Sequence, residues 1–350
     1  MKKLLVLFSL IANLTAFNCI AQTNEVKSIL WEISKDGIAQ KSYLLGTYHG
    51  SQNGIEYSLI DTLPQYKSIL ESVDAVATET DVNEFVELFK KSINDLMTNN
   101  HPAYTLLPDS VKCLRDIFEN EEEYLYTDSV IKEFRKKIIP LNYETLKPYY
   151  TSEVIALFDF VFDMKKESKD QKKDFVAIDL GINNNAEKMG KRIFYMETTQ
   201  GFMEGFEDSI YMDTCSLKKQ SHQLYSYCKK RSDLKNKEEE AKEEETKTYS
   251  HKLAELYLKQ DLDAALKEHD FLIEKQQQQS TDEPFSHKKF AEDFILVGRN
   301  KKWIPVIKEN VQKSSCLIAV GALHLPGEEG LVQLLREEGY TLKPMNIFAK

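Results

Sequence analysis

The sequence predicts an α/β protein built on a mixed, largely parallel central sheet with helical insertions. Two apolar segments, each followed by a Gly-x-x-His motif ending at His49 or His324, are typical of strands covered on both faces, as in parallel sheets. Segments with helical periodicity separate the expected strands, and such crossovers favour parallel pairing. The 350 residues, 42% of them hydrophobic, are sufficient for a substantial core.

The first part of the expected fold is a hairpin, a helix and a strand. Segments 28–34 and 41–45 are predicted strands, because the Asp-Gly between these two apolar runs favours a hairpin turn. A helix is expected over 58–71, where apolar residues recur on one face. The strand that follows, over 72–79, ends in the carboxylate of Glu79.

Two helix-rich segments, at about 83–173 and 202–289, interrupt the alternation of strands and helices. We expect them to be insertions in a single domain that spans 22–350. The remaining predicted elements, in chain order, are a strand over 175–179, a helix over 184–189, a strand over 193–197, a helical region over 290–311, a strand over 316–320, a helix over 329–338 and a strand over 340–347.

The N-terminus has the pattern of a signal peptide. Lys2 and Lys3 precede an apolar stretch over 4–17, which is shorter than the ~20 residues that a membrane-spanning helix needs. We expect residues 1–21 to be removed and the mature chain to be exported, either periplasmic or secreted. A lipid on Cys19 is the alternative, and membrane contact is expected only through the signal segment or such an anchor.

Composition and missing motifs exclude several classes of function. The net charge of −10, without a basic patch, argues against nucleic acid as a partner. The sequence contains no Gly-x-Ser-x-Gly elbow, no phosphate-binding P-loop and no His-Glu-x-x-His helix. It also lacks a Cys-x-x-Cys unit, although Cys215 and Cys228 are close enough in sequence to pair in an oxidising compartment; whether they do so is left open.

Polar residues stand at the end of five predicted strands or strand-like segments. If these strands are parallel, their carboxyl ends meet at one edge of the sheet, where α/β proteins bind ligands. Two imidazoles with one or two carboxylates are a common set of ligands for a divalent transition metal. The five residues are His49, Glu79, Asp179, Glu197 and His324.

The alternative is that each histidine only caps a loop through hydrogen bonds. For a single histidine that interpretation is favoured, whereas two matched Gly-x-x-His motifs favour a shared site. Glu79 and Glu197 could instead be solvated strand ends, and Asp179 could cap the helix that follows it.

Taken together, five segments resemble the TraB/PrgY/GumN family, which includes the animal Tiki proteases. They follow the family's order over nearly the whole mature chain. The segments are LLGTYHGS at 44–51, VATET at 76–80, AIDLGINNNAEKMGKRIFYMETTQ at 177–200, GRN at 298–300 and AVGALHLPGEEGLVQLLREEGY at 319–340.

The resemblance implies a mixed α/β fold related to the erythromycin esterase and ChaN group. It also implies metal-dependent proteolysis, with manganese or cobalt the usual suggestion for Tiki-type members. The residues that it assigns to the active site are His49, Glu79 and His324, with Glu197, Gln200 and Arg299 nearby.

Residues and resemblance together lead to the hypothesis of an exported metal-dependent hydrolase, a peptidase acting on peptides or proteins. His49, Glu79 and His324 are the expected ligands of Mn, Co or Zn. Glu79 and Glu197 are the candidate bases, and Arg299 is expected to steady a substrate carboxylate or an oxyanion. The further candidates are Asp179 and Gln200. The alternative is a non-catalytic protein that binds a peptide, haem or a metal in the same cleft.

Overall fold

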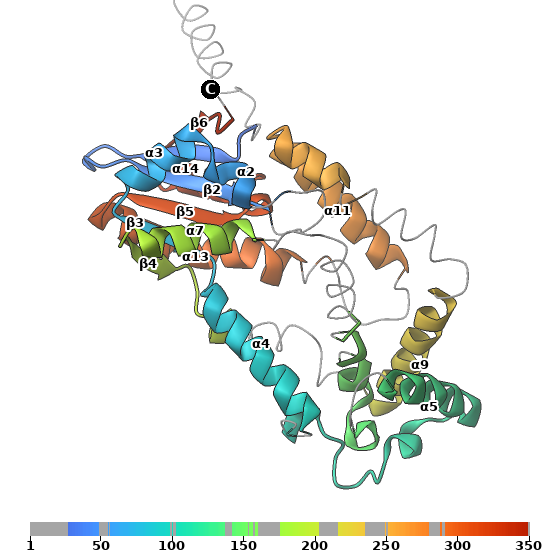
Figure 1. Cartoon of the computed structure of the whole chain (residues 1–350). Coiled ribbons are helices and arrows are strands. Elements are labelled where there is room, and N and C mark those ends of the chain that lie inside the picture. The colour runs from blue at the N-terminus through green and yellow to red at the C-terminus, as the bar shows by residue number, and fades with distance from the viewer. Residues whose placement is uncertain are drawn as a thin grey trace, which may run out of the picture.

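The computed structural model describes residues 27–48, 55, 57–98, 100, 103–136, 142–152, 154–156, 158–159, 176–202, 216–234, 249, 251–279, 288 and 291–348. Their centre is a six-stranded sheet in the order β4-β3-β5-β2-β1-β6 (Figure 1). The neighbouring pairs β2–β5, β5–β3 and β3–β4 are parallel, and β1 is antiparallel to both of its neighbours. The predicted mixed, largely parallel α/β sheet is confirmed. Its strands are β1 (Leu30–Ser34), β2 (Ser42–Thr47), β3 (Ala75–Thr78), β4 (Arg192–Tyr195), β5 (Cys316–Gly321) and β6 (Thr341–Met345).

The predicted N-terminal hairpin is also confirmed. Leu30 of β1 lies opposite Leu45 of β2, and the Asp-Gly turn places Gly37 at φ +85°, a conformation that glycine adopts without steric cost. The C-terminal strand β6 pairs with the other side of β1. The first and last strands of the described chain are therefore neighbours in the sheet.

Crossover helices connect the parallel strands and cover the sheet. The predicted helix over 58–71 is two helices, because Pro64 begins a new one and cannot donate the hydrogen bond that a continuous helix would need. Helix α2 contacts α3 and α7, and α13 contacts α14. The helices therefore form two layers, one on each face of the sheet. These helices are α2 (Tyr57–Asp61), α3 (Pro64–Ser72), α7 (Ile178–Lys188), α13 (Val297–Lys313) and α14 (Leu331–Glu337).

The predicted strand over 175–179 is wrong. Helix α7 begins at Ile178, so the helix expected over 184–189 starts six positions earlier. Ile178 and Ile182 are both fully buried, which is the i, i+4 spacing of a helix face. A short apolar run fits a buried strand and a buried helix equally well, and here the helical spacing decides.

A second, helical core lies apart from the sheet and contains residues from both predicted insertions. Helix α4 (Val82–Met97) leads away from the sheet toward α5 (Glu121–Arg135) and α9 (Leu217–Leu234), which pack on each other (Figure 1). Phe158, from the first of these insertions, is buried there. Cys228 is a free thiol buried in the same core, whereas Cys215 lies outside the described residues.

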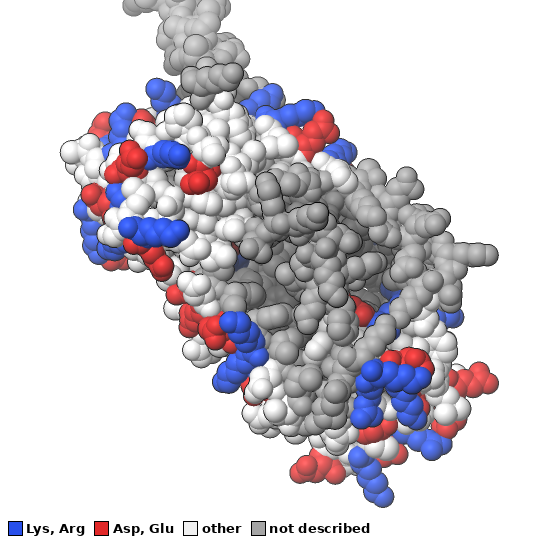
Figure 2. All heavy atoms as spheres, viewed as in Figure 1, with Lys and Arg blue, Asp and Glu red and all other residues white. Residues whose placement is uncertain are grey.

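The other named elements are one long helix and several short turns of helix, and residues 251–258 form a further helical stretch. None of the described helices is long and apolar enough to cross a membrane. On the face drawn in Figure 2, acidic and basic side chains are interspersed over the described elements. The elements are α11 (Leu262–Gln279), the π-helical turn η5 (Ala291–Ile295) and the 3₁₀ turns η2 (Ala103–Thr105), η3 (Leu114–Ile117), η4 (Tyr143–Thr145) and η6 (Ala322–His324).

Candidate active site

The carboxyl ends of the parallel strands lie level with one another at one edge of the sheet. Thr47, the last residue of β2, pairs with Gly321 of β5, and Thr78 of β3 pairs with Tyr195 of β4. His49 follows β2 but lies outside the described residues. The predicted site residues that this edge brings together are Glu79, Glu197 and His324.

Glu79 and Glu197 are held side by side because the β3–β4 ladder continues past both strands. The backbone N–H of Glu197 donates to the carbonyl of Glu79 at 3.1 Å. Arg299, in the first turn of α13, joins the two carboxylates: its Nε donates to Glu197 Oε1 at 2.7 Å and its Nη2 to Glu79 Oε2 at 2.7 Å. The exposed fractions of the side chains are 10% for Arg299, 14% for Glu79 and 18% for Glu197. One guanidinium thus faces two shielded carboxylates, which leaves a net negative charge.

The guanidinium of Arg299 also lies against two aromatic rings. Its Cζ is 4.9 Å from the ring centre of Phe202 and 4.5 Å from that of Trp303. Burial raises the pKa of the Glu197 carboxyl above its ordinary value, and the charge and hydrogen bond of Arg299 act in the opposite direction. Arg299 therefore offsets part of the rise in the pKa of Glu197 that burial causes.

His324 is oriented by Asn300. The Nδ2 of Asn300 donates to the backbone carbonyls of His324 at 3.2 Å and of Glu329 at 2.9 Å, so its Oδ1 must be the atom that faces the imidazole. His324 Nδ1 lies 2.7 Å from that oxygen and must donate to it. Because Nδ1 carries the proton, Nε2 of the neutral ring presents a lone pair, as in metal-binding histidines whose other nitrogen donates to a neighbouring group.

The lone pair of His324 is on the side of Glu79. Nε2 is 3.7 Å from Glu79 Oε1, which also accepts the backbone N–H of Gly321 at 2.7 Å. Two ligands of a tetrahedral ion at ~2.1 Å from it lie about 3.4 Å apart, so the donor pair fits a divalent transition ion. No group of three or more metal-binding side chains occurs within the described part of the chain, and the third predicted ligand, His49, is not in that part.

Each residue of the Gly-Arg-Asn segment at 298–300 has a specific structural role at this site. A Cβ on Gly298 would lie 1.7 Å from the backbone oxygen of Asp293, so only glycine lets the π-helical turn approach the start of α13. The next two residues point to the strand edge, where Arg299 binds the carboxylates and Asn300 binds His324. Three consecutive residues therefore place the cation and orient the imidazole.

Asp179 reaches the same edge from a helix rather than from a strand end. It lies in the first turn of α7, is 5% exposed, and accepts a hydrogen bond from Thr47 Oγ1 at 3.0 Å. The helix begins after Ala177 without a side-chain cap, so Asp179 is not a capping residue. The carboxylate was correctly expected at the edge, but the element that carries it was not.

A pocket of ≈ 350 Å³ opens at this edge. Glu79, Arg299 and His324 contribute its polar wall. Tyr257, in the helical stretch 251–258, also lines the pocket and donates to the carbonyl of Gly46 at 3.0 Å. Burial raises the pKa of Tyr257, so the phenol stays protonated and the hydrogen bond persists. The pocket is predominantly apolar with a few convergent polar groups, as is typical of ligand sites.

Three of the six described candidates, Glu79, Arg299 and His324, line the pocket, and Asp179 does not. Glu197 lies behind Arg299, and Gln200 is exposed and is not among the residues that line the pocket. Sequence reasoning did not single out Asn300, Trp303 or Tyr257. Asn300 had a signal, its position next to Arg299 in the Gly-Arg-Asn segment, whereas nothing in the sequence marks Tyr257 as a site residue.

The fold and this edge define a class: an α/β protein with an Arg-bridged carboxylate pair and an oriented histidine at the carboxyl ends of its parallel strands. The sequence model of the TraB/PrgY/gumN family matches residues 29–344, and the chain belongs to this family. No curated protein and no solved structure gives a match.

Proposed function

We propose that this protein is an exported metal-dependent hydrolase that cleaves peptide bonds. The observation that carries the proposal is the pair formed by His324 Nε2 and Glu79 Oε1, 3.7 Å apart at the wall of the pocket. A divalent transition ion held there, with His49 as the third expected ligand, would supply a Lewis acid and a bound water of lowered pKa. Manganese, cobalt and zinc all suit a donor set of nitrogen and carboxylate oxygen.

The chain's own residues have distinct roles in this proposal. Glu79 lines the pocket and is held by Arg299 and by the N–H of Gly321, so it is positioned to bind the ion or to accept a proton. Asn300 holds the proton of His324 at Nδ1. These contacts fix both groups before substrate binds, which is the preorganisation that catalysis requires.

Glu197 and Arg299 form the support of this arrangement. Glu197 does not line the pocket, and its side chain contacts the site through Arg299. We therefore assign it to holding and neutralising the guanidinium. Arg299 uses Nε and Nη2 for the two carboxylates, and Nη1, which has no hydrogen-bond partner within the described part of the chain, is a donor for a substrate oxygen or an oxyanion.

The proposal is tested with quenched fluorescent peptides and the mature chain loaded with manganese, cobalt or zinc. Glu79→Gln keeps the size of the side chain but removes its charge, and we expect turnover to fall about 10²- to 10⁴-fold while peptide binding persists. The matched control is Glu71→Gln, an exposed carboxylate on α3, which should hydrolyse peptides at the original rate.

Two results would contradict the proposal. Turnover in Glu79→Gln equal to that of the original chain would show that the pocket is not where the chemistry occurs. Peptide binding without cleavage under all three metals would favour the alternative, a non-catalytic peptide- or metal-binding protein that uses the same pocket.

A further inference from the structure

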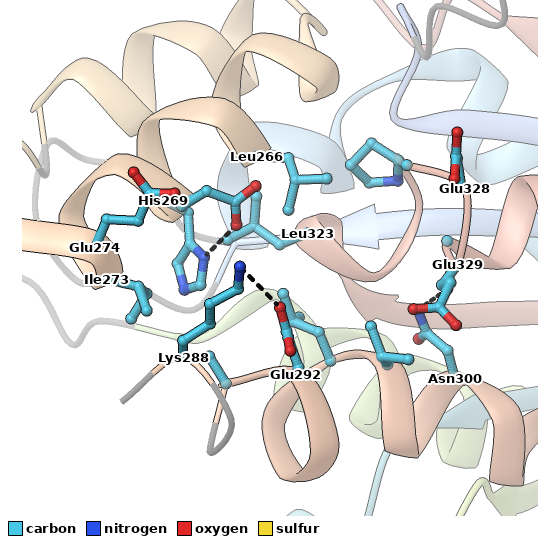
Figure 3. A pocket seen from close by; sticks show the side chains of 17 residues that line it. Leu266, His269, Ile273, Glu274, Lys288, Glu292, Asn300, Leu323, Glu328 and Glu329 are labelled. Carbon is cyan, nitrogen blue, oxygen red and sulfur yellow. Dashed lines mark hydrogen bonds and ion pairs between the residues drawn. The ribbon is translucent and has the colours of Figure 1, made fainter. Parts of the chain in front are cut away.

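A second pocket, of ≈ 420 Å³, adjoins the candidate active site. Leu296 and Leu323 line both pockets, so a single wall separates them. Figure 3 shows that its lining comes from α11, from the segment that leads into α13 and from the loop after β5. Its volume lies within the about 300–1,000 Å³ of typical ligand sites. A substrate bound at the first pocket would therefore have a place for a neighbouring residue here.

Part of the lining of the second pocket is apolar. Leu266 and Ile273 contribute from α11, and Leu323 projects from the turn that carries His324 (Figure 3). His269, on the same face of α11, adds no charge near neutral pH, because burial lowers its pKa. An aliphatic chain would bury apolar surface against these side chains.

The rim of the pocket is acidic. It carries five carboxylates and a single lysine within the part of the chain that the structure describes. Lys288 Nζ is 3.8 Å from Glu292 and Lys301 forms an ion pair with Glu329 at 2.5 Å, so those two carboxylates have cations close by. The others are Asp270, Glu274 and Glu328, and none of these three has a lysine or arginine partner among the described residues.

The loop that carries part of this rim is fixed in place. Gly327 has φ +88°, and a Cβ there would lie 3.0 Å from Leu266 Cδ2, so the loop packs closely on α11. A Cβ on Gly330 would lie 2.1 Å from a backbone oxygen. Asn300 binds the carbonyl of Glu329 at 2.9 Å. The backbone that carries these carboxylates is therefore fixed before a ligand arrives, which lowers the entropy cost of binding.

We propose that this acidic pocket is a recognition subsite for a lysine or arginine side chain of the peptide substrate. A long aliphatic stem that ends in a cation matches a pocket lined by both apolar side chains and carboxylates. That the ligand of this subsite belongs to a peptide rests on the proposed peptidase function. The preference of the subsite for a positive charge rests on the second pocket alone. Glu274 and Glu328 are the carboxylates that we expect to select the cation.

The test compares three sets of short fluorescein-labelled peptides that are identical except at one scanned position, which holds lysine, norleucine or glutamate. Binding to the mature chain is measured by fluorescence anisotropy, so the readout does not require turnover. At the position that enters the subsite, we expect the lysine peptide to bind about tenfold more tightly than the norleucine peptide, because each of two carboxylates should contribute about three- to fivefold in affinity. The glutamate peptide should bind most weakly.

The double variant Glu274→Gln/Glu328→Gln should reduce the preference for lysine over norleucine to about twofold or less. Both residues are exposed, so the substitutions are expected to leave folding intact, and thermal unfolding checks this. The matched control Glu71→Gln, on the other helical layer, should keep the full preference.

The inference is overturned if no scanned position prefers lysine, or if the double variant keeps the preference. It fails separately from the proposed function. Cleavage of all three peptide sets at equal rates would contradict the subsite and leave the hydrolase standing. A preference for lysine in binding, without cleavage of any peptide, would support the subsite and contradict the hydrolase.

Discussion

Replacing Arg299 by methionine should destabilise the protein strongly and in a pH-dependent way. Methionine fills much of the same space against Phe202 and Trp303 but removes the donors that bind Glu79 and Glu197. Two carboxylates with exposed fractions of 14% and 18% would then lie next to each other without a cation.

The magnitude follows from that burial. Breaking a buried ion pair by removing one partner costs about 3–5 kcal/mol, because a shielded charge is left uncompensated. The Arg299 site has two such carboxylates, so we expect a loss near the upper part of this range at pH 7–8. A surface pair gives the comparison: Lys308 and Glu338, with exposed fractions of 33% and 41%, should contribute below about 1 kcal/mol.

The sign of the pH dependence follows from Glu197. Burial raises the pKa of this carboxyl in the folded state, so protonation favours folding. The stabilising contribution of a group with a raised folded pKa is fully present below its ordinary pKa and is lost as the pH rises through the raised value. Arg299 opposes this loss, and its removal should raise the pKa of Glu197 further. The destabilisation caused by Arg299→Met should therefore be largest at pH 7–8 and shrink as the pH falls toward about 4.5.

Urea unfolding followed by circular dichroism at pH 8, 6 and 5 measures this difference for the original chain, Arg299→Met and the control Lys308→Met. The expected result is a large loss for Arg299→Met at pH 8 that decreases toward pH 5, and a small, constant loss for the control. A loss below about 1 kcal/mol for Arg299→Met, or one that does not change with pH, would refute the interpretation of a shielded charge cluster.

Three further substitutions test neighbouring parts of the site. Gly298→Ala forces a Cβ against a backbone oxygen at 1.7 Å and should cost about 2 kcal/mol or more in urea unfolding; a neutral result would refute the close approach. Asn300→Leu leaves the proton of His324 Nδ1 without its acceptor, so ¹⁵N NMR of the imidazole should change from one tautomer to a mixture, whereas an unchanged spectrum would contradict the assigned role. Tyr257→Phe removes the hydrogen bond to Gly46 and should cost about 1–2 kcal/mol of unfolding free energy; no loss would show that this bond contributes nothing.

The sequence predicts the sheet and its charged edge well, because both depend on local patterns. Apolar runs that end in a polar residue mark β3, β4 and β5 and place Glu79, Glu197 and His324 just beyond them. Once the strands are parallel, these side chains must meet at one edge. The same reasoning fails at 175–179, where an apolar run too short to show its period forms the start of α7 instead.

The contacts that orient the site could not be predicted, because they depend on long-range packing. Tyr257 and two carboxylates of the second pocket, Asp270 and Glu274, come from the second helix-rich insertion, and no pattern indicates which of its faces packs against the sheet edge. The tautomer of His324 depends on which backbone carbonyls bind Asn300, which is a property of the folded loop. His49 lies outside the described residues, so its role as a ligand stays a prediction.

The central claim is that His324 and Glu79 are two ligands of one divalent transition ion, and the metal content of the mature protein tests it most directly. Elemental analysis after reconstitution with manganese, cobalt or zinc should find one ion per chain in the original protein and in Glu71→Gln. It should find much less in His324→Ala, His49→Ala and Glu79→Gln. No bound metal in the original chain, or full occupancy in His324→Ala, would contradict the account.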